Sequence, residues 1–278
     1  MTAATQQHTI WLWLDGVFPR RISYFLFLKG LVRSPEDLRA GITTKSNLTV
    51  VPVSIIPLEG FRSSDPNHPY PEGSSSPCMR TLDVASGKST FIHESTSILF
   101  YLEELYPESP LQPSSAIERA CVMDLIGTFN LVTLDTNYFL RNTVPEHGMV
   151  MGLQPEHQTR AAALNSKGHE VKGLVKFQGW AQRNGFQTTG WLTPGMAGPG
   201  MVDLIMAASV RFIELVYGID ILEDKDLRPL AEWYVRFTAL PWWAGLEDQG
   251  NGVPNVLAFG RKSRAAWTKQ TGEYPPQL

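Results

Sequence analysis

The stretch FIHESTSILFYLEELYPESPLQP, residues 91–113, predicts a short strand that runs directly into an amphipathic helix. The apolar positions of that helix recur at helical spacing and are Ile98, Leu99, Leu102 and Leu105. Pro107 ends the pattern. At the joint stand an acid and a hydroxyl, Glu94 and Ser95, where one capping residue would be enough to start a helix. Two interpretations are open at this point: a plain helix cap, or a binding site for a small charged ligand.

The residues before this stretch alternate between strand and helix patterns. TIWLWLD (9–15) is short, apolar and aromatic and predicts a buried strand. PRRISYFLFLKGL (19–31) predicts a helix that ends at Gly30. A second strand is predicted at 47–55, and residues 77–95 predict a hairpin around the turn ASGK.

Two further features bear on how this sheet is built. Pro52 lies within the second strand and has no N–H group for pairing, so we expect that strand at a sheet edge. Residues 57–76 are rich in proline, glycine and serine and predict a long loop with at most a short helix. Loops of this length in compact domains are often functional.

The remainder of the chain has a different character. From Ala116 to about Leu240 the apolar spacing is helical. The tail from Pro241 is weakly patterned and is interpreted as an arm around the helical part. We therefore expect two domains: an α/β domain at 1–106, and an all-helical domain with a C-terminal arm at 107–278.

Composition argues against several classes of function. The net charge of −3 on 278 residues gives no electrostatic footprint for nucleic acid or an anionic membrane. No apolar run is long enough to span a bilayer, and the N-terminus MTAATQQHT lacks a signal-peptide pattern. Cys78 and Cys121 are too few for a disulfide framework, and the histidines show no ligand spacing, so we expect no metal. These features indicate a cytoplasmic protein.

The string ESTSILFYLEELYPESPLQP (94–113) resembles, nearly residue for residue, the E-S-x-x-I-x-x-Y-L-x-x-x-Y-P-x-x-P-L-x-P motif of the glutathione S-transferase superfamily. GPGMVDLIMA (198–207) and LAEWYVRFTALP (230–241) resemble two later segments of that family. The resemblance implies a thioredoxin-like α/β N-terminal domain, an all-α C-terminal domain and a homodimer. Within the superfamily, the chain looks similar to divergent fungal members of secondary metabolism.

The resemblance also implies a glutathione site. Glu94 would offer its carboxylate to the ligand's ammonium, and Ser95 would offer its hydroxyl and N–H, at a helix N-terminus, to the α-carboxylate. A zwitterion needs both functions and a cap needs only one, so the resemblance favours the binding interpretation. Pro77 stands where the family has a cis-proline, which presents the backbone of the preceding residue, here Ser76, to the cysteinyl unit. Phe18 keeps the family's aromatic position.

The segment DGVFPRRI (15–22) departs from the family where the thiol-activating residue is expected. Aligning Arg20 and Arg21 with the family's basic pair puts Gly16 in the place of a Ser or Cys. Glutathione's thiol would then be acidified by Arg20, by backbone N–H groups at the helix start, or by a residue from elsewhere. Glutaredoxin-like chemistry needs a cysteine in this loop and is excluded, and Cys78 is interpreted as a small packed residue.

The implied activity is the addition of glutathione's thiolate to an electrophilic conjugated alkene of a hydrophobic natural product. Reversible addition would give trans–cis isomerisation in secondary metabolism, which we favour. The alternatives are a conjugating transferase and a non-catalytic protein that binds glutathione or an apolar ligand. The residue pattern does not separate isomerisation from conjugation. Candidate residues for the substrate pocket are Phe129 and Tyr138, with Asn130 as a polar contact, although a residue at any one of these positions more often belongs to the core.

Overall fold

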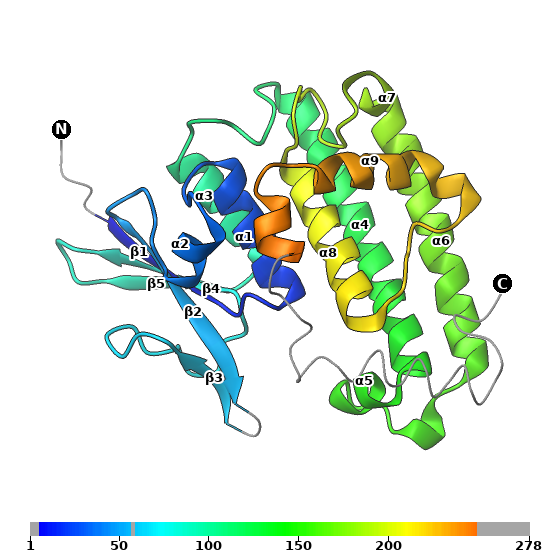
Figure 1. Cartoon of the computed structure of the whole chain (residues 1–278), viewed down its shortest axis with the longest axis horizontal. Helices are drawn as coiled ribbons and strands as arrows, with labels where there is room; N and C mark the ends of the chain where they lie inside the picture. The colour runs from blue at the N-terminus through cyan, green and yellow to red at the C-terminus, as the bar shows by residue number, and fades with distance from the viewer. Residues whose placement is uncertain (1–5, 57–58, 249–278) are drawn as a thin grey trace. The chain divides into compact units, whose positions relative to one another are not determined.

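The structure, a computed structural model, describes residues 6–56 and 59–248 (Figure 1). These residues form two compact units. The first unit contains the residues up to Leu111 together with the segment that starts at Pro241, and the second runs from Gln112 to Leu240. Among the helices described, none combines the length and hydropathy that a membrane span requires.

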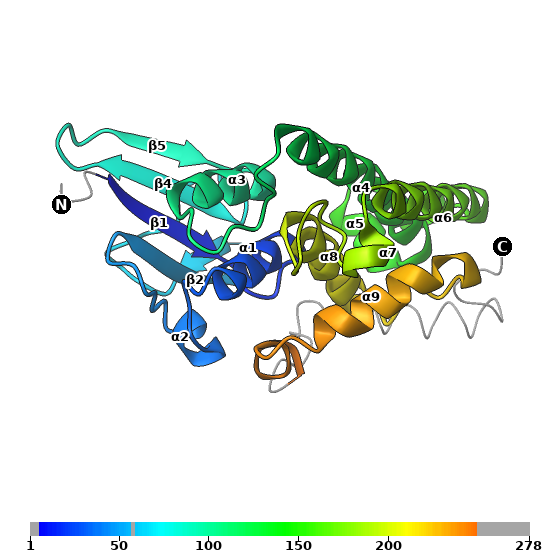
Figure 2. The same ribbon diagram turned by 90° about the horizontal axis from the view of Figure 1, so that it is seen from above.

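The first unit contains a mixed sheet with two helices packed together against one face. Its elements in chain order are β1 (Gln6–Leu12), α1 (Val17–Leu28), α2 (Pro35–Arg39), β2 (Leu48–Ile56), β3 (Gly60–Ser63), β4 (Cys78–Asp83), β5 (Ser89–Ile92) and α3 (Ser95–Leu105). The strand order is β3-β2-β1-β4-β5, with β1 parallel to β2 and the other neighbours antiparallel (Figure 2). Helices α1 and α3 contact each other along the sheet. This arrangement confirms the predicted thioredoxin-like domain.

Strand β2 is not an edge strand, so the prediction drawn from Pro52 is wrong. The pairing of β1 with β2 ends at Leu12 opposite Pro52, and the pairing of β2 with β3 begins one residue later, at Val53 opposite Ser63. The proline therefore lies where one ladder ends and the other starts. Its carbonyl still accepts a hydrogen bond from the N–H of Ser64 at 3.0 Å. A proline is tolerated in an inner strand here because the two neighbours pair with different stretches of that strand.

The predicted loop at 57–76 contains an unexpected strand, β3, and packs on the sheet. Its apolar side chains join a cluster around β1, which consists of Trp11, Val51, Val53 and Cys78, with Trp13, Phe61 and Tyr70 partly buried against it. Trp11 Nε1 donates to the carbonyl of His68 at 2.9 Å, which ties the loop to β1. The sequence showed the turn residues of this segment but not the aromatic anchors that hold it.

Local sequence explains where the helices of the first unit begin and end. Helix α1 starts at Val17, two residues before the predicted start, because Gly16 takes the extended N-cap conformation. It stops before Gly30, whose φ of 66° lies in the left-handed region that glycine adopts readily. Helix α3 ends at Leu105, two residues before Pro107, as predicted.

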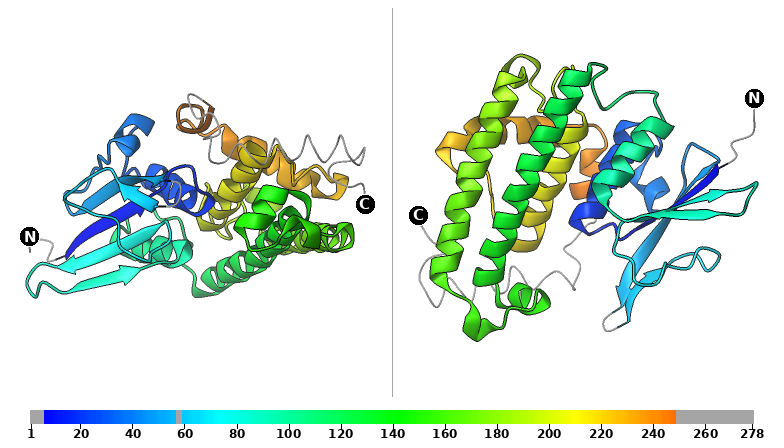
Figure 3. Two further views of the ribbon diagram at one scale, coloured as in Figure 1. Left: turned by 90° about the horizontal axis from the view of Figure 1, so that it is seen from below. Right: turned by 180° about the vertical axis from the view of Figure 1, so that it is seen from behind.

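The second unit is all-helical, as predicted. Its elements are α4 (Ala116–Thr143), α5 (Pro145–Val150), η1 (Pro155–His157), α6 (Arg160–Arg183), α7 (Phe186–Thr189), α8 (Met201–Tyr217), η2 (Lys225–Leu227) and α9 (Arg228–Thr238). The long helices α4 and α6 pack side by side (Figure 3). Between them lies a buried polar group, in which Glu170 accepts a hydrogen bond from the Thr136 hydroxyl at 2.9 Å and pairs with Lys167 at 3.0 Å.

The start of α8 is organised by one buried carboxylate. Gly200 is the N-cap and has no side chain to cap the helix; the Thr193 hydroxyl accepts the N–H of Val202 at 3.0 Å in its place, and Asp203 accepts the N–H of Gly200 at 2.9 Å. Asp203 also accepts from the N–H of Leu192, the N–H and hydroxyl of Thr193, and Trp233 Nε1, at 2.6–3.1 Å. Burial raises the pKa of this carboxyl, and the donors oppose that rise. Asp203 therefore joins α8, α9 and the segment before α8.

The segment after α9 returns to the first unit. It ends in a short π-helix, η3 (Ala244–Asp248), and its tryptophan Trp242 packs against Tyr24 and Phe27 of α1 with ring centroids 5.1 and 5.3 Å apart. The first residues of the predicted C-terminal arm therefore lie on α1. The rest of that arm, 249–278, is outside the described residues.

Candidate functional site

Three loops of the first unit meet at one end of its sheet. The loop after β1 is tied to the residue before the start of β4, because the N–H of Trp13 donates to the Ser76 hydroxyl at 2.8 Å. The end of β5 lies beside the start of β4, because Cys78 Sγ is 3.8 Å from His93 Nδ1. The predicted glutathione-binding residues stand on these three loops, so the fold brings them together.

The joint that starts α3 does not use its acid as a cap. Glu94 is the N-cap residue in extended conformation, and its carbonyl accepts the N–H of Ile98 at 2.9 Å. Its side chain makes no capping hydrogen bond and is exposed. Ser95 is the first residue of the helix and is 4% exposed. The carboxylate and the helix N-terminus are thus next to each other, with the carboxylate unused by the helix.

A second charged residue at this site, Arg21, was not predicted to be functional. Its side chain is buried in α1, with the guanidinium over the ring of Phe18, 5.0 Å from the centroid. Burial lowers the pKa of Arg21 to about 10, and the negative charge of Glu94 opposes this shift. Glu94 is therefore close enough to act on a cation from α1. The only signal in the sequence was the basic pair itself.

The residues before β4 have the backbone geometry that was predicted. The peptide bond between Ser76 and Pro77 is cis. Pro77 is buried, and the Ser76 side chain is occupied by the N–H of Trp13. Phe18, at the start of α1, is 48% exposed. An aromatic face is thus accessible beside the joint.

The position expected to hold the thiol-activating residue has no room for a side chain. A Cβ atom on Gly16 would lie 2.9 Å from Trp13 Cε3 and 3.1 Å from Pro19 Cδ. The glycine N–H donates to the carbonyl of Trp13 at 2.9 Å, which closes a tight turn. The packing of Trp13 and Pro19 around Gly16 therefore excludes a Ser or Cys at this position.

The start of α1 can offer backbone donors instead. The first N–H groups of a helix have no acceptor within it. In α1 these belong to Val17 and Phe18, since Pro19 has no N–H and that of Arg20 bonds to the carbonyl of Gly16 at 3.0 Å. Together with the helix dipole, these two donors favour an anion at this position.

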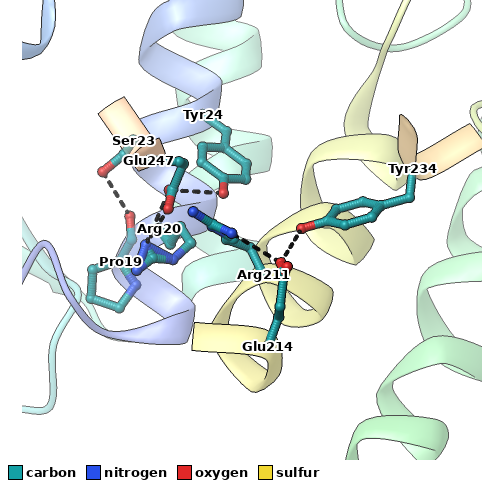
Figure 4. Close-up of polar contacts among 8 residues, drawn as sticks. All are labelled: Pro19, Arg20, Ser23, Tyr24, Arg211, Glu214, Tyr234 and Glu247. Atoms are coloured by element: carbon teal, nitrogen blue, oxygen red, sulfur yellow. Dashed lines mark hydrogen bonds and ion pairs between the residues drawn. The ribbon is translucent and has the colours of Figure 1, made fainter. Parts of the chain in front are cut away.

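Arg20, the predicted activating cation, is held by a carboxylate. Its Nη1 lies 3.1 Å from Oε1 of Glu247, a residue of η3 in the same unit (Figure 4). The same oxygen accepts the hydroxyl of Tyr24 at 2.9 Å. The partner of Arg20 is thus an acid 227 positions away in the sequence. Asp15 is nonetheless near both charges, since Arg20 lowers its pKa and Glu247 raises it, with burial the largest cause of its raised pKa.

Cys78 is a packed residue rather than an evident nucleophile. It is fully buried, and its thiol contacts the Ser74 hydroxyl at 3.6 Å. Burial raises the pKa of the Cys78 thiol, so the thiolate is disfavoured.

The predicted pocket residues all lie on α4 of the second unit. Phe129 is 1% exposed and packs on Phe177 with ring centroids 5.8 Å apart, so it is a core residue of that unit and not an accessible pocket residue. Helical spacing alone could not tell which face of α4 is covered. Asn130 is exposed, and Tyr138 is 45% exposed, with Arg141 over its ring. Within the described ranges, no group of three or more His, Cys, Asp or Glu side chains could hold a metal ion.

No protein-family model and no curated protein matches the sequence. Solved structures match through the fold. A glutathione S-transferase from Rhodospirillum rubrum has a TM-score of 0.55 at 17% identity, over 91% of this chain and 98% of that one. Maleylacetoacetate isomerase from Anaeromyxobacter dehalogenans, solved with dicarboxyethyl glutathione and citrate, has a TM-score of 0.58 at 17% identity, over 92% and 98%. A theta-class glutathione S-transferase from Xanthomonas axonopodis pv. citri has a TM-score of 0.52 at 16% identity, over 86% and 96%. At these identities the likeness shows the fold, which is that of glutathione transferases.

Proposed function

We propose that this protein is an enzyme that binds glutathione and adds its thiolate to an electrophilic conjugated alkene of a hydrophobic substrate. One observation carries the proposal. The joint at the start of α3 holds an exposed carboxylate, Glu94, that does not cap the helix, beside a buried hydroxyl, Ser95, at the helix N-terminus. An exposed acid that makes no capping bond, next to a helix N-terminus, fits a ligand that carries an ammonium next to a carboxylate.

In this proposal each end of glutathione has a partner on one of the three loops. The γ-glutamyl ammonium pairs with Glu94, and its α-carboxylate takes the donors at Ser95, where the helix dipole adds to the attraction. The backbone of Ser76, beside the cis bond to Pro77, pairs with the cysteinyl unit. Support comes from the fold neighbours, since the maleylacetoacetate isomerase was solved with a glutathione derivative.

The sulfur is proposed to lie at the start of α1. Because Gly16 leaves no space for an activating hydroxyl, the N–H groups of Val17 and Phe18 are the donors that remain at that turn. Two such donors and the helix dipole favour thiolate over thiol. Arg20 does not contact the sulfur in this proposal, since Glu247 holds its guanidinium.

The proposed reaction is reversible addition. The thiolate sulfur forms a bond to the β-carbon of an alkene conjugated to an electron-withdrawing group, and the electron pair of the double bond moves onto that group. Rotation about the resulting single bond, followed by expulsion of the thiolate, restores the alkene in the other geometry, so glutathione is not consumed. Protonation of the adduct before expulsion would give the conjugate instead. We place the enzyme in fungal secondary metabolism, close to the trans–cis isomerase of pseurotin biosynthesis, with Asn130 and Tyr138 of α4 as candidates for substrate contacts.

Calorimetry with glutathione tests the binding site. Glu94→Ala and Ser95→Ala should each lose about 1.5–3 kcal/mol of binding free energy, which is about ten- to a hundredfold in Kd. Glu104→Ala and Ser97→Ala are matched controls, because both are exposed residues of α3 away from its first residue, and they should bind as the wild type does. Wild-type affinity in both Glu94→Ala and Ser95→Ala would refute the site.

Incubation with glutathione and a conjugated polyene, followed by mass spectrometry and proton NMR, tests the reaction. Unchanged mass, with a vicinal proton coupling constant that changes from the trans to the cis range or the reverse, indicates isomerisation. A gain of one glutathione indicates conjugation. Absence of turnover by protein that binds glutathione would contradict the enzyme proposal and favour a binding protein.

We extend the proposal to a cytoplasmic homodimer. A reducing compartment fits the free thiols of Cys78 and Cys121. Light scattering at micromolar concentration measures the oligomeric state, and a mass near the 31.0 kDa of one chain would contradict the dimer.

A further inference from the structure

A buried ionic cluster joins the segment Pro241–Asp248 to α1 (Figure 4). The carboxylate of Glu247, 2% exposed, receives Arg20 Nη1 at 3.1 Å and the Tyr24 hydroxyl at 2.9 Å. Arg20 is itself 5% exposed. Charged groups are rarely buried unless they are paired, so this ion pair is part of the protein interior and not a surface contact.

The cluster fixes the first half of α1. Arg20 and Tyr24 are four residues apart and therefore lie on one face of the helix, one turn apart. Glu247 bridges them, and Trp242 stacks on Phe27 at an interplanar angle of 14°, a further turn along. Side chains on three successive positions of this face are thus held by a segment that lies more than two hundred residues later in the chain.

The charges of the cluster reach the turn before α1. Asp15 directly precedes Gly16 and is partly buried. Its carboxyl responds to Arg20 and to Glu247 with opposite sign, because the cation lowers its pKa and the anion raises it. The opposite charges of Arg20 and Glu247 thus oppose each other at the turn that leads into α1.

We propose that Glu247 controls the charge at the thiol-binding turn: it neutralises Arg20 and leaves the backbone donors of Val17 and Phe18 to set the acidity of the sulfur. This inference rests on the proposed function. It assigns a role to a residue outside both the sequence motif and the three loops of the site. Arg20 and Glu247 act as one neutral unit, and removing either charge alone changes the field at the sulfur.

Titration of Asp15 by carbon-13 NMR tests the cluster without glutathione. In Glu247→Gln the pKa of Asp15 should fall, and in Arg20→Gln it should rise, with Arg20 having the larger effect. Tyr24→Phe is the matched control, because it removes a hydrogen bond to Glu247 without changing a charge, and it should leave the Asp15 pKa unchanged. An Asp15 pKa that is the same in all variants would overturn the inference.

Ultraviolet titration of bound glutathione then tests the effect on the sulfur. The thiol pKa should fall by about half a unit in Glu247→Gln and rise by about half a unit in Arg20→Gln, which is about a threefold change in thiolate fraction. The double variant Arg20→Gln, Glu247→Gln should return to the wild-type value. A residue with a purely structural role would not produce opposite signs.

The double variant also decides the matter if a single variant does not fold. It removes both partners of the buried ion pair at once, so neither of them is left buried alone. If Arg20 itself activated the sulfur, the double variant would raise the thiol pKa, and that result would overturn the inference. Glutathione that fails to bind the wild type, with Asp15 responding as expected, would refute the proposed function and leave the cluster in place.

Discussion

Placing a serine at position 16 would supply a hydroxyl where the resemblance to glutathione transferases implied one, and the structure predicts that Gly16→Ser damages the site instead. The added Cβ would stand 2.9 Å from Trp13 Cε3 and 3.1 Å from Pro19 Cδ. Ordinary contacts of this kind begin at 3.4 Å, so the Trp13 ring must retreat by about half an ångström before the hydroxyl itself is accommodated.

That retreat is resisted on both sides of Trp13. Its backbone N–H is held by Ser76, its carbonyl by Gly16, and its ring lies 6.2 Å from the ring of Phe61 between centroids. Overpacking of this kind costs about 1–3 kcal/mol of the free energy of unfolding. Because the same loop leads into Val17, we also expect glutathione binding to weaken by about tenfold, an estimate that corresponds to about 1.4 kcal/mol.

Urea denaturation and calorimetry measure both effects, and a double variant isolates their cause. In Trp13→Ala, Gly16→Ser the clash with the Trp13 ring is absent and only the looser contact with Pro19 remains, so the loss of stability should be smaller than the sum of the two single losses by about 1–2 kcal/mol. Gly127→Ser is the control, because nothing lies within 4 Å of a Cβ at that helical position, and it should be neutral or slightly stabilising. Wild-type stability in Gly16→Ser, with additive losses in the double variant, would refute this account of the loop.

Three further predictions concern other residues. Burial lowers the pKa of His147 to about 4, below its value of 6.5 in the unfolded chain, so the unfolded chain binds more protons between these values. The free energy of unfolding should therefore fall by about 3 kcal/mol as pH falls from 6.5 to 4. The effect should disappear in His147→Gln but persist in His157→Gln, which alters an exposed residue. Asp203→Asn should lose about 3–5 kcal/mol of the free energy of unfolding in urea denaturation, because an amide nitrogen replaces one carboxylate oxygen and two or three of the five buried donors then lose their acceptor. Cys78→Ala should keep most turnover and glutathione affinity, and an inactive variant that still binds glutathione would contradict a mechanism without a protein thiol.

The joint at 94–95 was predictable because its signals are local. Apolar spacing, the proline after the helix and the polar pair at its start all lie within one short stretch. What the sequence could not reveal was that the Glu94 side chain makes no capping bond, since either residue could have served. The same locality explains why the hairpin at 77–95 and the helices of the second unit were predicted correctly.

The failures involve contacts between distant residues. Pro52 predicted an edge strand because the rule for proline concerns one strand, whereas its position depends on where two neighbours begin and end. Phe129 and exposed Asn130 are neighbours on α4 but lie on different faces of the helix. The face that carries Phe129 is buried because α6 packs against it, and the sequence of α4 alone does not show this. Glu247 lies in a weakly patterned tail, and nothing near it in the sequence points to Arg20.

The return of residues 241–248 to the first unit makes that unit discontinuous along the chain. During synthesis, the sheet and α1 are complete long before Glu247 leaves the ribosome. Until the whole second unit has been synthesised, α1 therefore lacks the partners of Arg20, Tyr24 and Phe27. A fragment that stops at Leu111 would leave a guanidinium without its carboxylate and two aromatic rings without their cover. Such a fragment should aggregate or bind hydrophobic dyes, and fusing residues 241–248 to it through a flexible linker should restore its solubility.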